Sequence, residues 1–223
     1  MERAFLAMVF AYLLGSVPFA YIVTRWRTGH DIRYLGDGNG GARNVYHMVG
    51  PGSGILVGVL DLGKGYAAYV VSQRLEAPYW AVLAAGFAVV LGHGFPIFLR
   101  GQGGKGVAVS MAFLLGLMPL STLVGVGLLG LVNLLLREFN KGLAVAVAAM
   151  VLLSPLFGYG VWLALYALTL FVALWGKKTL DLPRERIIWA QNPWRDGAKP
   201  DWYPGSSHTQ GPDAAESSSA IQQ

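Results

Sequence analysis

Long apolar runs separated by short polar segments dominate the pattern of residues along the chain. Because backbone groups cannot stay unpaired in hydrocarbon, about 20 apolar residues in a helix are needed to cross about 30 Å of bilayer core. Seven runs reach or approach that length: residues 4–24, 55–71, 79–99, 107–118, 120–136, 143–156 and 158–175. The pattern therefore predicts an all-α, polytopic membrane protein with about seven transmembrane helices.

Composition supports this prediction. Of the 223 residues, 54% are hydrophobic and only 13% are charged, whereas about a quarter of the residues of an average soluble domain are charged. For residues 4–24 the alternative is a secretory signal peptide, which carries positive charge before the apolar run and a small-residue cleavage site after it. Here Arg25 and Arg27 follow the run instead, which favours a retained helix.

The loop charges predict the orientation. An odd number of spans puts residues 25–52, 100–106, 137–142 and the C-terminal segment on one side of the membrane. These segments hold nearly all the loop Lys and Arg, while the opposite side offers only Arg3 and Arg74. The positive-inside rule therefore makes the glycine-rich loops and the C-terminus cytoplasmic. The net charge of +5 is explained by topology and requires no nucleic-acid partner.

The chain divides into three parts by composition. Residues 1–176 are expected to form one transmembrane domain, residues 177–203 a cytoplasmic segment close to the membrane, and residues 204–223 a polar, serine-rich tail of the kind typical of disorder. The chain has no cysteine, which excludes disulfides, thiolate nucleophiles and cysteine metal sites. No other metal-ligand cluster or covalent nucleophile is recognisable, so we expect no metal.

Two glycine-rich loops, "GDGNGG" at 36–41 and "GQGGKG" at 101–106, fit the fingerprint of dinucleotide-binding proteins. That fingerprint needs a preceding strand and an acidic residue about 20 positions on. Asp61 has the spacing but lies inside an apolar run. The stretch "GVLDLGKG" at 58–65 resembles a phosphate-binding loop, but Gly65 stands where Ser or Thr should hold magnesium. We therefore expect no nucleotide cofactor.

The second loop can bind an anion without a nucleotide. Glycines let successive backbone amides turn inward into a nest, and a following helix N-terminus adds partial positive charge. Gly103, Gly104 and Gly106 would form the nest, Lys105 would supply a full charge, and a helix would begin near Val107. The alternative is a flexible glycine hairpin with a lysine that reaches to the membrane surface.

The first loop adds Asn39, Arg43, Asn44 and His47. Asparagine amides can donate to phosphate or hydroxyl groups, and an arginine can bind a phosphate through two hydrogen bonds. Two such loops on one face predict two phosphorylated groups, or one phosphate held twice. Alternatively the arginines only set topology, which leaves the density of Gly and Asn unexplained.

Three ionisable residues lie within apolar runs, where burial is expensive. Asp61 and Lys64 are three positions apart, so they share a helix face and can neutralise each other. We expect this pair to organise the site. His93 ends its run just before the second loop, where it is either a helix-end donor or a proton carrier.

Four stretches resemble the bacterial acyl-phosphate:glycerol-3-phosphate acyltransferases called PlsY. They are "GSVPFAY", "GDGNGGARNV", "DLGKG" and "LGHGFPIFLRGQGGKGVAVS", against family patterns of approximately GSIPFGY, GSGNxGATNV, DxxKG and GHxFPxxxxxxGGKGVA. The similarity runs over residues 15–110 in family order and spacing, and the segment from GHxFP to GGKG is its most specific part.

The resemblance implies a multi-pass enzyme of the bacterial inner membrane with seven helices and cytoplasmic active-site loops. Such an enzyme moves a fatty acyl group from acyl phosphate to the 1-hydroxyl of glycerol 3-phosphate and releases phosphate and lysophosphatidic acid. It uses no cofactor, and its partners are these two substrates and membrane lipid.

By the same resemblance, the second glycine loop with Lys105 would hold acyl phosphate. Gly38, Asn39 and Asn44 would orient glycerol phosphate, with Asp37 and Arg43 beside them. Lys105, Asn39 and His93 are the candidate catalytic residues. The proton of the attacking hydroxyl could pass to a phosphate oxygen, to His93 or to Asp37.

The chain departs from the family pattern at several positions. Asp37 replaces a serine, Arg43 a threonine and His47 an arginine, while Asn140 and Leu143 replace serines of a later family segment resembling RYxSLGS. Arg43 could offset Asp37 by pairing with it. The last family motif, resembling RHxxNIxRLxxGxE, is not recognisable. Two alternatives therefore remain: a non-catalytic or substrate-altered lipid-binding paralogue, and an organic-phosphate transporter, which should show polar residues deep in several spans.

Overall fold

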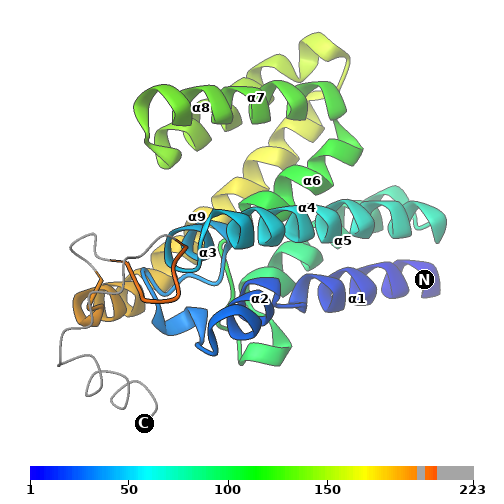
Figure 1. Cartoon of the computed structure of the whole chain (residues 1–223). Coiled ribbons are helices and arrows are strands. Elements are labelled where there is room, and N and C mark those ends of the chain that lie inside the picture. Colours follow the sequence, from blue (N-terminus) through cyan, green and yellow to red (C-terminus); the bar gives the residue numbers. More distant parts are fainter. Residues whose placement is uncertain (195–198, 205–223) are drawn as a thin grey trace, which may run out of the picture.

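The computed structural model describes residues 1–194 and 199–204, and all regular structure in these ranges is helical, as the apolar pattern predicts. Figure 1 shows the arrangement. The α-helices are α1 (Glu2–Ser16), α2 (Phe19–Thr28), α3 (Ala42–Met48), α4 (Pro51–Arg74), α5 (Tyr79–Gly94), α6 (Val107–Leu117), α7 (Pro119–Leu136), α8 (Phe139–Leu153) and α9 (Val161–Gln191), and the 3₁₀ turns are η1 (Ile32–Tyr34), η2 (Ile97–Leu99) and η3 (Pro155–Phe157).

Each predicted apolar run contains at least one helix. Five helical segments of the described chain are long and apolar enough to cross a membrane: Glu2–Thr28, Pro51–Arg74, Tyr79–Leu99, Pro119–Leu136 and Val161–Gln191. Helices α6 and α8 are apolar but shorter, so the count of seven spans stays a prediction.

The first run is not one continuous helix, because Pro18 separates α1 from α2. Proline has no amide hydrogen and clashes with the preceding turn, which breaks the helical ladder and leaves nearby carbonyls without helical partners. The side chain of Lys64 on α4 supplies a partner by donating to the Val17 carbonyl oxygen at 3.0 Å. The sequence pattern missed this break because Pro18 lies in the middle of an apolar run.

Small residues let the helices approach closely. The face of α1 that packs on α5 carries Ala7, Ala11 and Gly15, all buried. A methyl group on Gly15 would lie 2.2 Å from the Val89 carbonyl oxygen, and one on Gly92 would lie 2.2 Å from that of Tyr12. Such stripes are typical of membrane helices, whose association depends on close packing because lipid is as apolar as their side chains.

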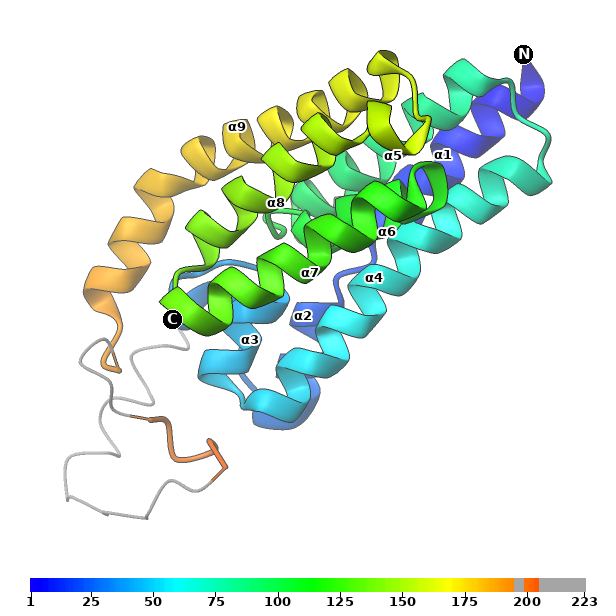
Figure 2. The same cartoon turned by 90° about the horizontal axis from the view of Figure 1, so that it is seen from above.

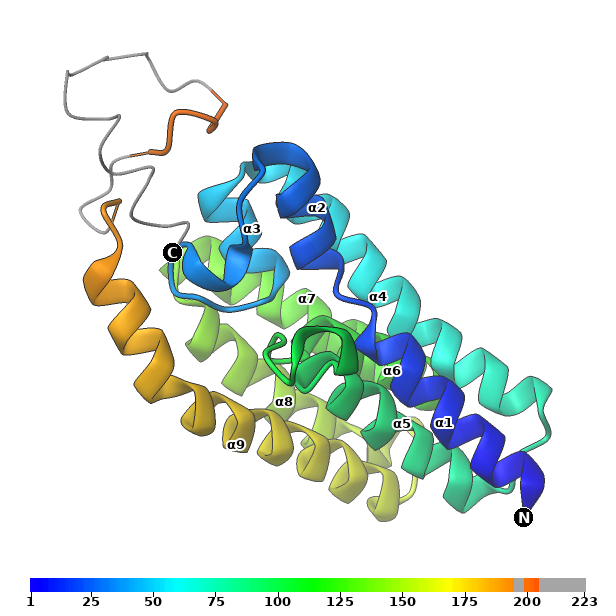
Figure 3. The same cartoon turned by 90° about the horizontal axis from the view of Figure 1, so that it is seen from below.

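Helix α4 packs on α6, and α7 pairs with α8 as a hairpin. Figures 1 and 2 show this hairpin on the side of α6 away from α1. Figure 3 shows α9 running along the bundle to the end that carries α2 and α3, opposite the N-terminus. The glycine-rich loops and the last turns of α9 therefore belong to the same end of the molecule.

The C-terminal part of the described chain returns to the first loop. Trp194 and Trp202 pack against a small core that includes Ile32, Leu35 and Val45. Helix α9 runs without interruption across residue 176, so residues 177–191 of the expected membrane-proximal segment continue this helix. Of the expected tail, residues 205–223 lie outside the described residues.

Candidate active site

The second glycine loop is held against the end of α5. The Gly103 amide donates to the Gly94 carbonyl at 3.2 Å, and the Gly104 amide donates to the His93 carbonyl at 3.1 Å. The predicted nest therefore has fewer free amides than expected. The amides of Gly103 and Gly104 donate to the C-terminal carbonyls of α5 and cannot donate to a ligand. Lys105, Gly106 and the first turn of α6 line the adjacent cavity.

Helix α6 begins directly after this loop. Its N-cap, Gly106, has a φ of +85° and provides no side-chain cap, so the first amides of α6 lack the side-chain acceptor that often satisfies them. The φ value also explains the glycine, since L-residues rarely adopt that conformation. The predicted helix start near Val107 is confirmed.

The two glycine loops touch each other. A methyl group on Gly40 would lie 3.0 Å from the Gly103 carbonyl carbon. One on Gly104 would lie 2.8 Å from the Gly40 carbonyl oxygen and 2.4 Å from Nε2 of His93. The glycines thus permit a backbone-to-backbone approach that brings residues far apart in sequence into one site.

Asn44 shapes the first loop from inside. Its side-chain amide donates to the carbonyl oxygens of Leu35 at 2.8 Å and Asn39 at 3.1 Å, and its Oδ1 accepts the Asp37 amide at 3.3 Å. The Asp37 carboxylate in turn accepts the Asn39 amide at 3.0 Å. Asn44 is 3% exposed, so its contacts are those of a loop-organising residue.

A cavity of about 520 Å³ lies between these loops and helices α4, α6, α7, α8 and α9. We call it the polar cavity because eight polar or charged residues line it, although the rest of its wall is apolar. Seven residues predicted for the site line it: Asp37, Asn39, Arg43, Asp61, His93, Lys105 and Gly106. The other five predicted residues, although described by the structure, are not among its lining residues: Gly38, Asn44, Lys64, Gly103 and Gly104.

Asn39, which lines this cavity, carries a buried amide oxygen without a partner among the described residues. Its residue is 8% exposed, and its Oδ1 has no hydrogen-bond partner within the described parts of the chain. A buried amide oxygen without a partner is costly. This atom is covered by the protein, so the Asn39 side chain would have to turn toward the cavity before Oδ1 could meet a ligand.

The predicted pair of Asp61 and Lys64 is a direct ion pair, with Oδ1 and Nζ 3.0 Å apart. His93 joins it, since its Nδ1 lies 3.6 Å from the same carboxylate oxygen. All three side chains are buried. The cluster links α4 to the last turn of α5, directly behind the second loop.

Two cations face the cavity from elements other than the second loop. The guanidinium of Arg43 lies over the Phe139 ring, 5.6 Å from its centroid, and Nζ of Lys178 lies 3.4 Å from Oδ1 of Asn140. Sequence reasoning placed neither Lys178 nor Asn140 in the site, because both come from helices that only the tertiary fold brings there. Asn140 was noted solely as a departure from the family pattern.

The expected pairing of Arg43 with Asp37 does not occur, since the ion pairs within residues 1–194 and 199–204 do not include these two side chains together. Asp37 is engaged by its own loop instead. Burial first, and then the charges of Arg43 and Lys199, lower the pKa of His47, which favours a neutral imidazole at neutral pH. Arg43 therefore carries the positive charge on this side of the cavity.

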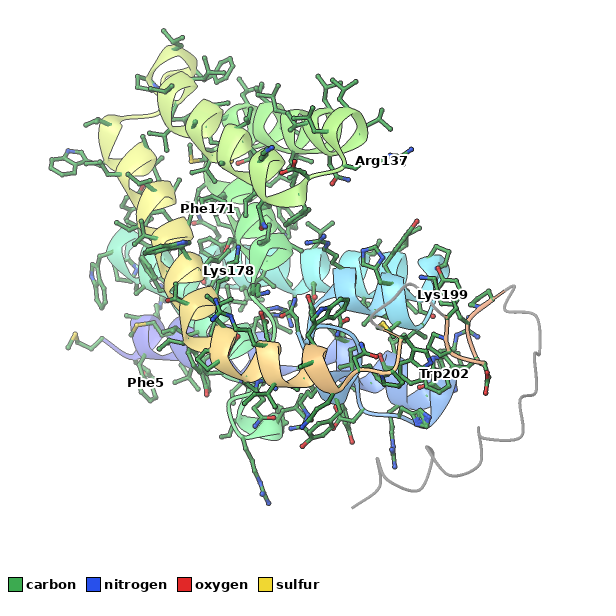
Figure 4. All side chains as sticks on the ribbon, turned by 90° about the vertical axis from the view of Figure 1, so that its left-hand side faces the viewer. Phe5, Arg137, Phe171, Lys178, Lys199 and Trp202 are labelled. Atoms are coloured by element: carbon green, nitrogen blue, oxygen red, sulfur yellow. The ribbon has the colours of Figure 1, made fainter. Side chains whose placement is uncertain are left out.

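A second, apolar cavity of about 740 Å³ lies between α8 and α9 and adjoins the polar cavity. We also call it the apolar groove. Its walls include Leu143, Val147, Val151, Leu168 and Phe171. Five residues line both cavities and form what we call the shared rim: Lys105, Val107, Phe139, Asn140 and Lys178. Figure 4 shows Phe171 and Lys178 along α9, below the α7–α8 hairpin.

Fold and site together define a class: a multi-pass helical membrane protein whose site suits a ligand with an anionic head and an apolar tail. The sequence model of the family described as glycerol-3-phosphate acyltransferase matches residues 5–180. The chain belongs to this family.

Named relatives agree with this assignment. A glycerol-3-phosphate acyltransferase of Synechococcus is 43% identical over 68% of this chain and 76% of its own length. Another, from Halalkalibacterium halodurans, is 39% identical over 78% of this chain and 86% of its own length. The crystal structure of PlsY, an integral membrane glycerol 3-phosphate acyltransferase, in its glycerol 3-phosphate form, has a TM-score of 0.72 and 29% identity, covering 81% of this chain and 90% of that one.

Proposed function

We propose that this protein transfers a fatty acyl group from acyl phosphate to the 1-hydroxyl of glycerol 3-phosphate at the cytoplasmic face of a bacterial inner membrane. The observation that carries the proposal is the shared rim, where a polar cavity with three cations meets an apolar groove. An acyl phosphate bound there would place its tail in the groove and its reactive carbonyl at the junction. Family membership and the relatives' names point to the same acceptor.

The second loop suits the phosphate of the donor. Lys105 provides a full charge, and the amides at the start of α6 add the partial positive charge of a helix N-terminus. As the acceptor hydroxyl attacks the carbonyl carbon, a carbon–oxygen bond forms and the bond from that carbon to the phosphate oxygen breaks. Charge grows on the departing phosphate, where fixed donors lower the barrier most.

Glycerol 3-phosphate fits the opposite side of the polar cavity. Arg43, Lys178 and Asn140 can hold its phosphate through charge-assisted hydrogen bonds. Asn39 could accept a hydrogen bond from a glycerol hydroxyl once its side chain turns the buried Oδ1 toward the cavity. The two substrates would then lie on either side of the rim, with the hydroxyl near the donor carbonyl, which is the positioning that bimolecular transfer needs.

The released phosphate is the best candidate to take the hydroxyl proton. A phosphate oxygen is a base of roughly imidazole strength, because the second pKa of a phosphate ester is about 6. His93 directs Nδ1 toward Asp61, and Asp37 already accepts an amide of its own loop. Both side chains already make a contact within the protein, whereas the leaving group is next to the hydroxyl by necessity.

Reconstitution into lipid vesicles tests the proposal. Purified protein supplied with acyl phosphate and radiolabelled glycerol 3-phosphate should form labelled lysophosphatidic acid and orthophosphate in equal amounts. Lys105→Ala should lower turnover about 100- to 1,000-fold, the loss typical when a donor to developing charge is removed. Lys141→Ala, which removes an exposed lysine paired with Glu138, is the matched control.

The other outcomes identify the alternatives. Uptake of label into the vesicles without lipid product would indicate a transporter. Saturable binding of acyl phosphate without orthophosphate release would indicate a lipid-binding paralogue. Either result would refute the proposed transfer, whereas full turnover by Lys105→Ala would refute only the role given to Lys105.

A further inference from the structure

The last turns of α9 bind both glycine loops. Arg184 donates from Nη2 to the Gly38 carbonyl at 3.1 Å, and Asn192 donates from Nδ2 to the Gly36 carbonyl at 3.1 Å. Between them in sequence, Glu185 reaches the second loop, where it pairs with Lys105. The C-terminal part of α9 and its C-cap residue thus contact both loops through three side chains.

The Glu185 contact is close and sheltered. Nζ of Lys105 lies 3.0 Å from Oε1 and 3.1 Å from Oε2 of the carboxylate. Glu185 is 8% exposed as a residue, and its side chain is more buried than that of Lys105. A pair in such surroundings is less screened by water than a surface pair, so each member constrains the other more strongly.

The position of Glu185 relative to the cavities decides its role. Lys105 lines both cavities, while Glu185, also among the described residues, lines neither. The carboxylate therefore contacts the ammonium from outside the set of residues that encloses the substrate space. It does not occupy the place of a phosphate, and an ammonium with three N–H donors can hold it and a ligand together.

Lys105 needs such support. Its backbone is held against α5 through Gly104, but a lysine side chain still has about 2 kcal/mol of rotamer entropy to lose. A carboxylate fixed on a helix restricts that freedom before the substrate binds. Preorganised charge contributes more to catalysis than charge that must be recruited during the reaction.

We propose that Glu185 is a positioning residue that directs the ammonium of Lys105 at the leaving phosphate. The proposal rests on the proposed acyl transfer. It also gives the reach of α9 a purpose, because the helix that forms one wall of the apolar groove sets the charge at the reacting end of the donor.

The test is a double-mutant cycle in the vesicle assay. Glu185→Gln keeps the shape and removes the charge. We expect kcat/KM for acyl phosphate to fall about 10- to 100-fold, the usual effect of losing a residue that orients a catalytic group, while KM for glycerol 3-phosphate stays within about twofold. In the Lys105→Ala background the same substitution should have no further effect, since a residue acting only through Lys105 cannot be lost twice.

Two further variants keep the result interpretable. Glu185→Asp retains the charge one methylene short and should show intermediate activity. Glu138→Gln breaks an exposed lysine pair and should be silent. Thermal unfolding in detergent separates a general structural effect, since a positioning loss leaves the unfolding temperature of Glu185→Gln close to that of the wild type.

Three outcomes would overturn the proposal. Wild-type or higher kcat/KM in Glu185→Gln would mean that the carboxylate is idle or competes with the donor. A further loss in the Lys105→Ala background would mean that Glu185 acts independently. A wild-type protein without transfer activity would refute the acyl transfer itself. An active wild type with an unaffected Glu185→Gln variant would refute only the positioning role, so the two failures can be told apart.

Discussion

Replacing Asp61 with asparagine should destabilise the bundle far more than the loss of one exposed charge would. Asp61 and Lys64 are 2% and 4% exposed, and their charged atoms are 3.0 Å apart. Asp61→Asn leaves the Lys64 ammonium buried without its counter-ion, in contact with neutral groups such as the Val17 carbonyl oxygen. Removing one member of a buried pair typically costs about 3–5 kcal/mol, because the remaining charge is desolvated without compensation.

That cost can be converted into a measurable shift. For a domain of this size, 1 kcal/mol moves the unfolding temperature by about 2–4 °C, so Asp61→Asn should lower it by about 6–20 °C. Thermal unfolding in detergent, followed by loss of monodisperse protein in size-exclusion chromatography, provides the measurement. Glu138→Gln, which breaks an exposed pair, should change stability by less than about 1 kcal/mol.

The double variant Asp61→Leu with Lys64→Met separates charge from packing. Removing both charges avoids the uncompensated ammonium, so stability should largely return. It should not return fully, because the Val17 carbonyl oxygen at the Pro18 break loses its donor, at a cost of about 1–3 kcal/mol. An Asp61→Asn protein as stable as the wild type, or a double variant worse than the single one, would refute this reasoning.

Two further predictions concern substrates. Ala148→Phe fills the apolar groove and should shift the preference toward shorter acyl phosphates by steric exclusion. Competition between donors of different chain length measures this preference, with Val145→Phe, an exposed position of α8, as the control. An unchanged preference would place the acyl tail elsewhere. Lys178→Ala should raise KM for glycerol 3-phosphate by about 10- to 150-fold, from the roughly 1.5–3 kcal/mol of a hydrogen bond to a charged group. Lys141→Ala should leave it unchanged, and an equal rise for acyl phosphate would show that Lys178 serves the donor instead.

The sequence was informative where structure is local. Apolar runs predict helices because each backbone group must be paired within its own segment in lipid, and every predicted run contains helix. The Pro18 break escaped detection because its effect depends on a single residue inside a run of otherwise suitable hydropathy.

The site was predictable in kind but not in detail. Glycines indicate which backbone can approach closely, yet not which amides will be used, so Gly103 and Gly104 turned out to bind the end of α5. The sequence could not predict that Lys178 and Glu185 belong to the site, because nothing in the pattern of their helix indicates that it contacts both loops. Only the packing of α9 brings Glu185 to Lys105 and Lys178 to the shared rim.

The junction of the polar cavity and the apolar cavity at the shared rim has a consequence for how products leave the site. The two products of the proposed transfer differ in polarity, and each of the two cavities suits one of them. Under the proposed function, orthophosphate would leave from the polar cavity, and the new lipid would leave through the apolar cavity between α8 and α9. The acyl tail would then stay among apolar side chains until it reaches the lipid, so the product would need no carrier.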